Sequence, residues 1–76
     1  MNRRIDENRI LIDNARSYIM VHHPEWDKSL ALKAVVKDQG SYWEVTFELP
    51  PMAIGGVPII EVDKRSNEII RALHTQ

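Results

Sequence analysis

The sequence predicts an α+β fold in which one N-terminal helix packs on a four-stranded antiparallel sheet. Three features of the chain predict it. They are an apolar stripe with helical spacing near the start, two segments of alternating apolar and polar residues, and two short β-branched runs around a polar turn. A chain of 76 residues has the length of one domain. We therefore predict a single domain over residues 1–76, with residues 1–5 as a flexible tail.

The helix is predicted over residues 6–21. Apolar side chains recur there at intervals of three and four residues and form one stripe, made by Leu11, Ile12, Ala15, Tyr18 and Ile19. Asp6 and Glu7 near the start suit the positive end of the helix dipole. Pro24 disfavours helical geometry at His23, so we expect the helix to end near His22.

The four strands are predicted over residues 29–37, 41–49, 57–63 and 68–74. In the first strand the residues that share an apolar face are Leu30, Leu32, Ala34 and Val36. In the second strand they are Trp43, Val45, Phe47 and Leu49, and this face places Trp43 in the core. Short connections favour pairing between strands that are neighbours in sequence. The helix is then expected to cover one face of a sheet whose strands follow chain order.

The third and fourth strands are expected to form a hairpin around a polar turn at residues 63–67. Regular alternation places one set of apolar residues on one face of this hairpin, namely Ile60, Val62, Ile70 and Ala72. It places Ile59, Ile69 and Leu73 on the opposite face. One apolar face can cover the helix, and the other is available to a partner or to self-association.

Two glycines end the link between the second and third strands. Gly55 and Gly56 follow a segment with two prolines, residues 50–54. Glycine adopts backbone angles that are closed to other residues, so we interpret the pair as a requirement of backbone geometry. Replacing Gly56 by valine is expected to lower stability if that residue has a positive φ.

The charge balance gives no support for a nucleic-acid or membrane partner. The net charge is −1, and the chain has no cysteine, which is compatible with a reducing compartment. Charged residues between positions 6 and 16 interrupt the apolar stretch, so neither a signal peptide nor a membrane span is expected. We therefore expect a cytoplasmic protein.

No catalytic, cofactor-binding or metal-binding site is predicted, and an enzyme is not expected. His22 and His23 are adjacent and project differently, whereas a zinc site needs about four ligands in defined geometry. Acid–base catalysis by Glu44 and Glu48 would require a cleft that shifts a pKa, so these residues are interpreted as an acidic binding face. Trp26 has two interpretations, as packing over one edge of the core and as an exposed binding anchor.

Three segments resemble a known family. Residues 43–50 (WEVTFELP), 55–63 (GGVPIIEVD) and 67–70 (NEII) are similar to segments of the small NTF2-fold immunity proteins of bacterial polymorphic-toxin systems. The resemblance covers residues 15–74, and the spacing from Leu49-Pro50 through Gly55-Gly56 to Asp63 is its most specific part. It implies a non-enzymatic protein that binds a cognate toxin and blocks its activity.

Four acids are the candidate contacts if the toxin is a nuclease. Their side chains would take the place of substrate phosphates, and they are Glu44, Glu48, Glu61 and Asp63. The residue pattern of the hairpin also resembles that of PepSY domains. A PepSY-like interaction module is therefore the second interpretation. A self-associating module, with a homodimer as its product, is the alternative that follows from the two apolar faces of the hairpin.

Overall fold

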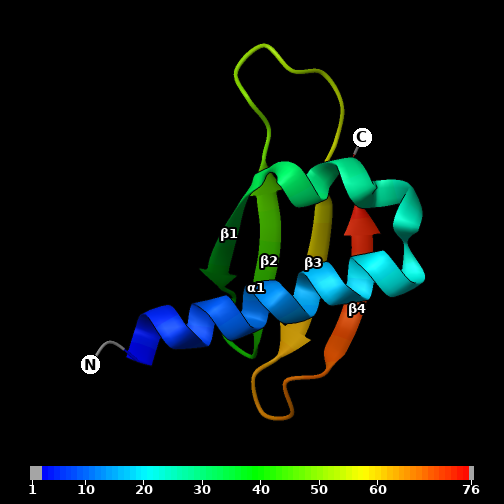
Figure 1. Cartoon of the computed structure of the whole chain (residues 1–76). Helices are drawn as coiled ribbons and strands as arrows, with labels where there is room; N and C mark the ends of the chain where they lie inside the picture. The colour runs from blue at the N-terminus through cyan, green and yellow to red at the C-terminus, as the bar shows by residue number, and fades with distance from the viewer. Residues whose placement is uncertain (1–2, 76) are drawn as a thin grey trace.

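The computed structural model describes residues 3–75, with the side chains of residues 8–75. A long helix comes first, followed by a short 3-10 helix and four strands (Figure 1). The elements are α1 (Arg3–His22), η1 (Pro24–Ala31), β1 (Lys33–Asp38), β2 (Tyr42–Glu48), β3 (Pro58–Asp63) and β4 (Ile69–His74). The predicted α+β fold is confirmed. Residues 3–5, predicted as part of a tail, are helical, and residues 1 and 2 lie outside the described residues.

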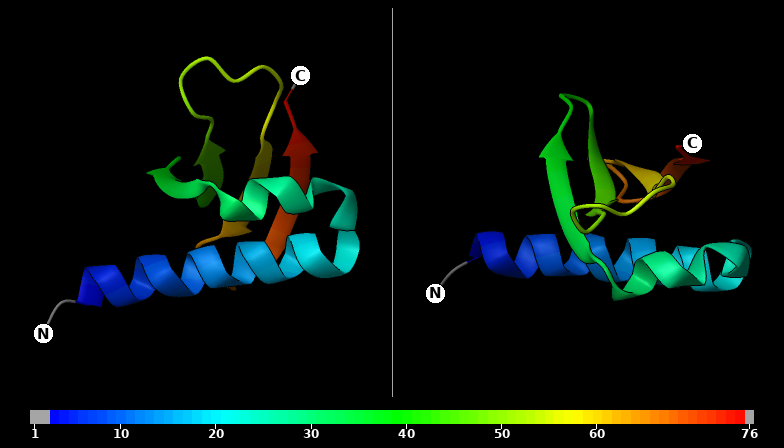
Figure 2. Two further views of the ribbon diagram at one scale, coloured as in Figure 1. Left: turned by 45° about the horizontal axis from the view of Figure 1, so that its top comes forward. Right: turned by 90° about the horizontal axis from the view of Figure 1, so that it is seen from above.

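The strands form one antiparallel sheet in the order β1-β2-β3-β4, as the short connections predict. Helices α1 and η1 both lie on the same side of the sheet (Figure 2). Two layers result, with helices on one face and the second face of the sheet turned away from them. We call this second face the outer sheet face.

The core lies between α1 and the middle of the sheet. Its buried apolar residues are at most 5% exposed, and they are Leu11, Ala15, Ile19, Val45, Phe47, Ile60 and Val62. The helical stripe is therefore predicted correctly, as are Val45 and Phe47 on the apolar face of β2. Leu49, predicted on the same face, follows the end of β2 and is exposed, so the prediction is wrong at that residue. Trp43 is half-buried at the edge of this core, and the Lys64 ammonium lies 4.3 Å from the centre of its ring.

The segment before β1 is not a strand. Residues 24–31 form η1, and the strand begins at Lys33, so the prediction of a strand from Ser29 is wrong. Ser29 is buried and Leu30 packs against the core from this helix. The alternation of Leu30 and Leu32 imitates a strand, but the 3-10 turn places the same apolar side chains on the core. The Arg16 guanidinium donates to the carbonyl of Leu32 at 3.2 Å, which ties α1 to the end of this segment.

A β-bulge in β4 reverses the predicted faces of two isoleucines. Glu61 is opposite Arg71 and Val62 is opposite Ile69, so Ile70 is an extra residue in β4. Ile69 packs against the core, whereas Ile70 is 54% exposed. The regular alternation that placed Ile70 on the core face is therefore wrong at this point, because one additional residue exchanges the two faces.

The bulge predicts unequal effects for two adjacent and identical residues. Ile69→Ala should lower the free energy of unfolding by at least about 1 kcal/mol, because it removes apolar side chain that packs on the core. Ile70→Ala should change it by less than about 0.5 kcal/mol. Urea unfolding of the two variants measures the difference. A larger effect at Ile70 would contradict the bulge.

Candidate partner-binding surface

Two rows of side chains cross the outer sheet face. Strand register places one row in the order Lys37, Glu44, Glu61 and Arg71. The neighbouring row is Val35, Thr46, Ile59 and Leu73. No helix of residues 3–75 lies over this face, because both helices lie on the other side of the sheet. The face thus offers a charged row beside a mainly apolar row.

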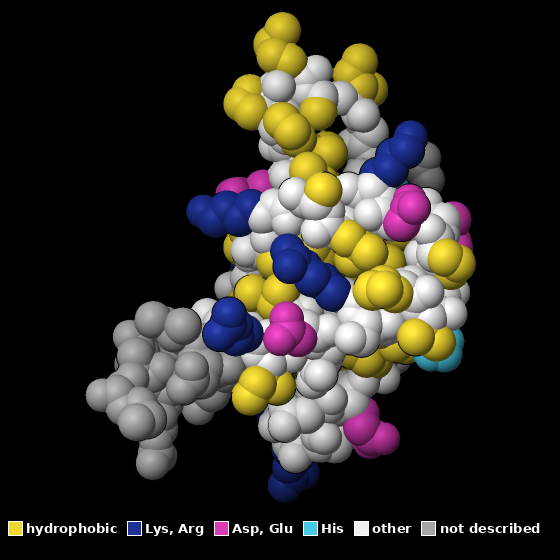
Figure 3. All heavy atoms as spheres, in the orientation of Figure 1, with side chains coloured by type: hydrophobic (Ala, Val, Ile, Leu, Met, Phe, Trp, Pro, Cys, Tyr) yellow, Lys and Arg dark blue, Asp and Glu magenta, His cyan; other side chains and the backbone are white. Residues whose placement is uncertain are grey.

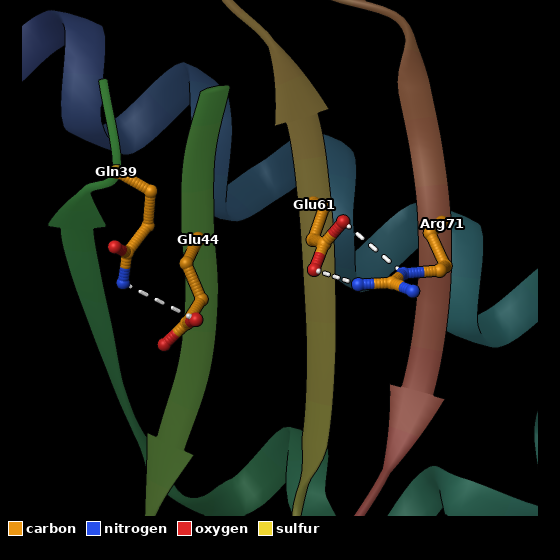
Figure 4. Close-up of polar contacts among 4 residues, drawn as sticks. All are labelled: Gln39, Glu44, Glu61 and Arg71. Carbon is orange, nitrogen blue, oxygen red and sulfur yellow. Dashed lines mark hydrogen bonds and ion pairs between the residues drawn. The ribbon is translucent and has the colours of Figure 1, made fainter. Parts of the chain in front are cut away.

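The charged row contains an ion pair between a buried carboxylate, Glu61, and an exposed guanidinium, Arg71. The Glu61 carboxylate accepts two hydrogen bonds from the Arg71 guanidinium, at 3.2 Å from Nε and 2.9 Å from a terminal nitrogen (Figure 4). Glu61 is 7% exposed, so its charge needs a partner inside the protein. The hydrogen bond to Glu61 and the charge of Glu61 raise the pKa of Arg71. Two parallel hydrogen bonds of this kind stabilise the pair and also fix the relative orientation of the two side chains.

Glu44 lies directly opposite Glu61 on the neighbouring strand. Its carboxylate accepts a hydrogen bond of 3.4 Å from the side-chain amide of Gln39, in the turn between β1 and β2. Like charges in opposite cross-strand positions repel each other. Arg71 pairs with Glu61, and Lys37 lies opposite Glu44 on its other side. Glu44 is half-buried and Glu48, further along β2, is exposed. Exposed lysines of β1 lie directly opposite both acids, Lys37 opposite Glu44 and Lys33 opposite Glu48, so the accessible acids of the outer sheet face alternate with basic side chains.

The fourth predicted acid has a local structural role. One carboxylate oxygen of Asp63 accepts hydrogen bonds from the backbone N–H of Ser66 at 3.0 Å and from its hydroxyl at 2.8 Å. These bonds, the hydroxyl first, lower the pKa of Asp63. The carboxylate holds the turn between β3 and β4 in place. The structure thus brings the four acids to one face and separates them into the accessible Glu44 and Glu48 and the internally bonded Glu61 and Asp63.

Trp26 belongs to a cluster of aromatic and histidine rings beside the core. Its ring stacks on His23, with centroids 3.9 Å apart and planes 6° from parallel, and lies 5.3 Å from the ring of His74. Tyr18 contacts His22 at 4.4 Å between centroids. Trp26 is half-buried and packs against the core. Among the residues that the structure describes, no group of three or more His, Cys, Asp or Glu side chains is arranged to hold a metal ion.

The loop between β2 and β3, residues 49–57, is a feature that the sequence interpretation passed over. It extends beyond the end of the sheet, and apolar side chains cover it (Figure 3). Met52 is 97% exposed and Ile54 is 99% exposed. The sequence signal was present, because this segment contains large apolar residues and no charge between two turn-forming pairs, Pro50-Pro51 and Gly55-Gly56. We call it the β2–β3 loop.

Comparison with protein families places these features in context. A model of the NTF2 fold immunity protein family matches residues 15–76. The chain belongs to the NTF2 fold immunity protein family. The match includes residues 15–22 of α1, the whole sheet and the β2–β3 loop. It confirms the first of the two resemblances found in the sequence, and the single helix on an antiparallel four-stranded sheet is consistent with an NTF2-like fold.

Membership of the NTF2 fold immunity protein family implies a toxin as partner and a non-catalytic role. No curated protein and no solved structure matches the chain. Within residues 3–75, no helix combines the length and the apolar character needed to cross a membrane.

Proposed function

We propose that this chain neutralises a cognate bacterial toxin by binding it directly, in a stoichiometric complex and without a catalytic step of its own. The family match over residues 15–76 is the observation that carries the proposal. We place the encounter in the cytoplasm, and the cysteine-free sequence is compatible with that reducing compartment.

The outer sheet face is the surface that we assign to the toxin. It lies opposite the helices, and its apolar row can exclude water from a contact while its charged row fixes orientation. The Glu61–Arg71 pair is already satisfied inside the protein and keeps the face in one geometry. We propose inhibition by occlusion, in which the bound chain covers the surface by which the toxin reaches its target. Occlusion requires a binding surface and no catalytic group.

Growth and co-purification test the proposal together. The protein encoded immediately upstream is expressed in bacteria with and without this chain. We expect growth arrest in its absence, recovery in its presence, and a complex of the two proteins with a fixed ratio on size exclusion. Recovery of growth without a complex would contradict direct binding. Growth arrest that persists although the chain is folded and abundant would contradict neutralisation altogether.

The accessible acids predict an electrostatic contribution to association. If the toxin contacts nucleic acid through a basic surface, Glu44→Gln with Glu48→Gln should lower the association rate constant by a factor of about three to ten at low salt. The effect should shrink at high salt, because mobile ions screen surface charges. Stopped-flow fluorescence at two salt concentrations measures both quantities.

A matched pair of substitutions provides the control for this experiment. Glu25→Gln with Asp27→Gln removes the same charge from η1, on the opposite side of the sheet, where both residues are exposed. We expect these substitutions to leave the rate constant nearly unchanged. Equal slowing by both pairs would show that net charge alone acts, and would remove Glu44 and Glu48 from the proposed contact.

A further inference from the structure

The β2–β3 loop presents the most exposed large apolar side chains described in the protein. Met52 and Ile54 are 97% and 99% exposed, and Leu49 at the start of the loop is 38% exposed. The loop carries no charged side chain. In the space-filling view, its apolar atoms form a projection beyond the body of the protein (Figure 3). Contiguous apolar surface of this kind is typical of protein contact sites.

A hydrogen-bonded turn forms the tip of the loop. The N–H of Ala53 donates to the carbonyl of Pro50 at 3.1 Å and closes a turn of four residues. Pro51 occupies the second position, where its fixed φ suits the turn, and Met52 occupies the third position with a φ of 75°. Glycine and asparagine are the residues that normally take this third position. A methionine there places a long apolar side chain at the tip in spite of unfavourable backbone geometry.

The second half of the loop is attached to the end of the sheet. The N–H of Val57 donates to the hydroxyl of Thr75 at 2.8 Å, and the N–H of Thr75 donates to the carbonyl of Val57 at 2.9 Å. Gly56 lies so close to Thr75 that a Cβ atom would overlap the Thr75 carbonyl. A projection that is fixed at its tip and at its base loses little conformational freedom when a partner binds it.

A projecting loop with apolar side chains at its tip fits a protein partner that offers an apolar hollow. A pocket on this chain itself is lined by Ile10, Leu11, Trp43, Lys64 and Asn67, at the end of the sheet opposite the loop. A second copy seated there would bind head to tail, an arrangement that propagates into rings or filaments. The ammonium of Lys64 and the amide of Asn67 also make that pocket a poor match for two apolar side chains. The toxin is therefore the occupant to which the observations lead.

We propose that the β2–β3 loop is the apolar anchor of the complex, with Met52 and Ile54 inserted into a hydrophobic pocket on the toxin. This inference rests on the proposed function. The loop directly follows Glu48, so it leaves the sheet beside the last acid of the outer sheet face. Large side chains that are buried at the centre of an interface commonly supply most of its affinity. The charged row then sets the rate of association and the orientation of the toxin, and the loop sets the lifetime of the complex.

Titration calorimetry with the purified upstream-encoded protein tests the inference. Met52→Ser with Ile54→Ser should raise the dissociation constant of the complex by about 100-fold or more. The control is Met20→Ser with Val21→Ser on α1, where the side chains are 64% and 73% exposed. We expect the control to bind like the parent chain. An unchanged affinity of the loop variant, with the parent still binding, would overturn the inference and leave the proposed function standing.

A single substitution separates a binding role from a structural one. Met52→Gly removes the side chain and supplies the residue that the turn geometry favours. We expect it to unfold at the same temperature as the parent or higher, and to bind about 30-fold more weakly. Loss of stability without loss of affinity would overturn the inference.

Two further outcomes are informative in the same set of measurements. If the parent chain fails to bind the upstream-encoded protein, the proposed function fails and this inference fails with it. Sedimentation of the free chain tests the other occupant. Self-association of the parent that the two serine substitutions in the loop abolish would identify a second copy in the toxin's place and overturn the inference.

Discussion

Ile60→Ala is expected to lower the free energy of unfolding by about 2–5 kcal/mol. Ile60 is completely buried in β3 between α1 and the neighbouring strands, so the smaller side chain leaves a cavity that its neighbours fill only in part. A chain of 76 residues has a total stability of about 4–11 kcal/mol. The substitution should therefore remove a large share of the stability, and chemical denaturation followed by Trp fluorescence measures it.

Ile54→Ala is the matched control for this substitution. It makes the same chemical change at a side chain that is 99% exposed, and we expect a change of less than about 0.5 kcal/mol. Comparable losses at the two positions would show that Ile54 is packed in the free protein, and would contradict the description of the β2–β3 loop. The same control confirms that loop variants retain the fold when their affinity is measured.

Gly56→Ala is expected to destabilise the protein by about 1–3 kcal/mol, as overpacking commonly does. The added Cβ would lie 1.6 Å from the carbonyl oxygen of Thr75, so the backbone must move. This reason differs from the one predicted from the sequence. Gly55 has the positive φ, at 124°, whereas Gly56 is required because the end of the chain passes close to it. The glycine pair thus combines two different requirements.

A double-mutant cycle tests the contact between Gly56 and Thr75. A chain that ends at His74 has no Thr75 carbonyl, so Gly56→Ala should have little further effect in that shorter chain. We expect the truncation alone to lower the melting temperature modestly, because it removes the hydrogen bonds between Thr75 and Val57. Additive losses from the two changes would refute the contact.

Much of the fold is predictable from local pattern. The stripe through Leu11, Ala15 and Ile19 is specific to a helix, and the alternation of Val45 and Phe47 in β2 is specific to a strand with one buried face. Both patterns extend over enough residues to exclude the other periodicity. Leu30 and Leu32 represent too short a pattern, because two apolar residues with a spacing of two also fit the 3-10 helix and the turn into β1.

The candidate site is less predictable, because its properties depend on residues that are distant in sequence. The alternation of β2 places Glu44 and Glu48 on one sheet face, but the pairing of Glu61 with Arg71 depends on the register of β3 and β4. A bulge sets that register. The exposure of Met52 and Ile54 depends on where the loop leaves the sheet. The sequence does not show this, because apolar residues of the same types also occur in protein cores.

The sequence by itself determined the order of the elements, the apolar faces of α1 and β2, the antiparallel meander and the family. The elements and their faces follow from periodicity and turn chemistry within short windows of the chain, whereas the family follows from the resemblance of whole segments to known members. Only the tertiary structure decided the role of η1, the side on which Ile69 and Ile70 lie, and the reason for Gly56. It also decided which acids stay accessible and where the apolar loop projects. Each of these depends on contacts between segments, and packing free energy between segments overrides local preference where that preference is weak.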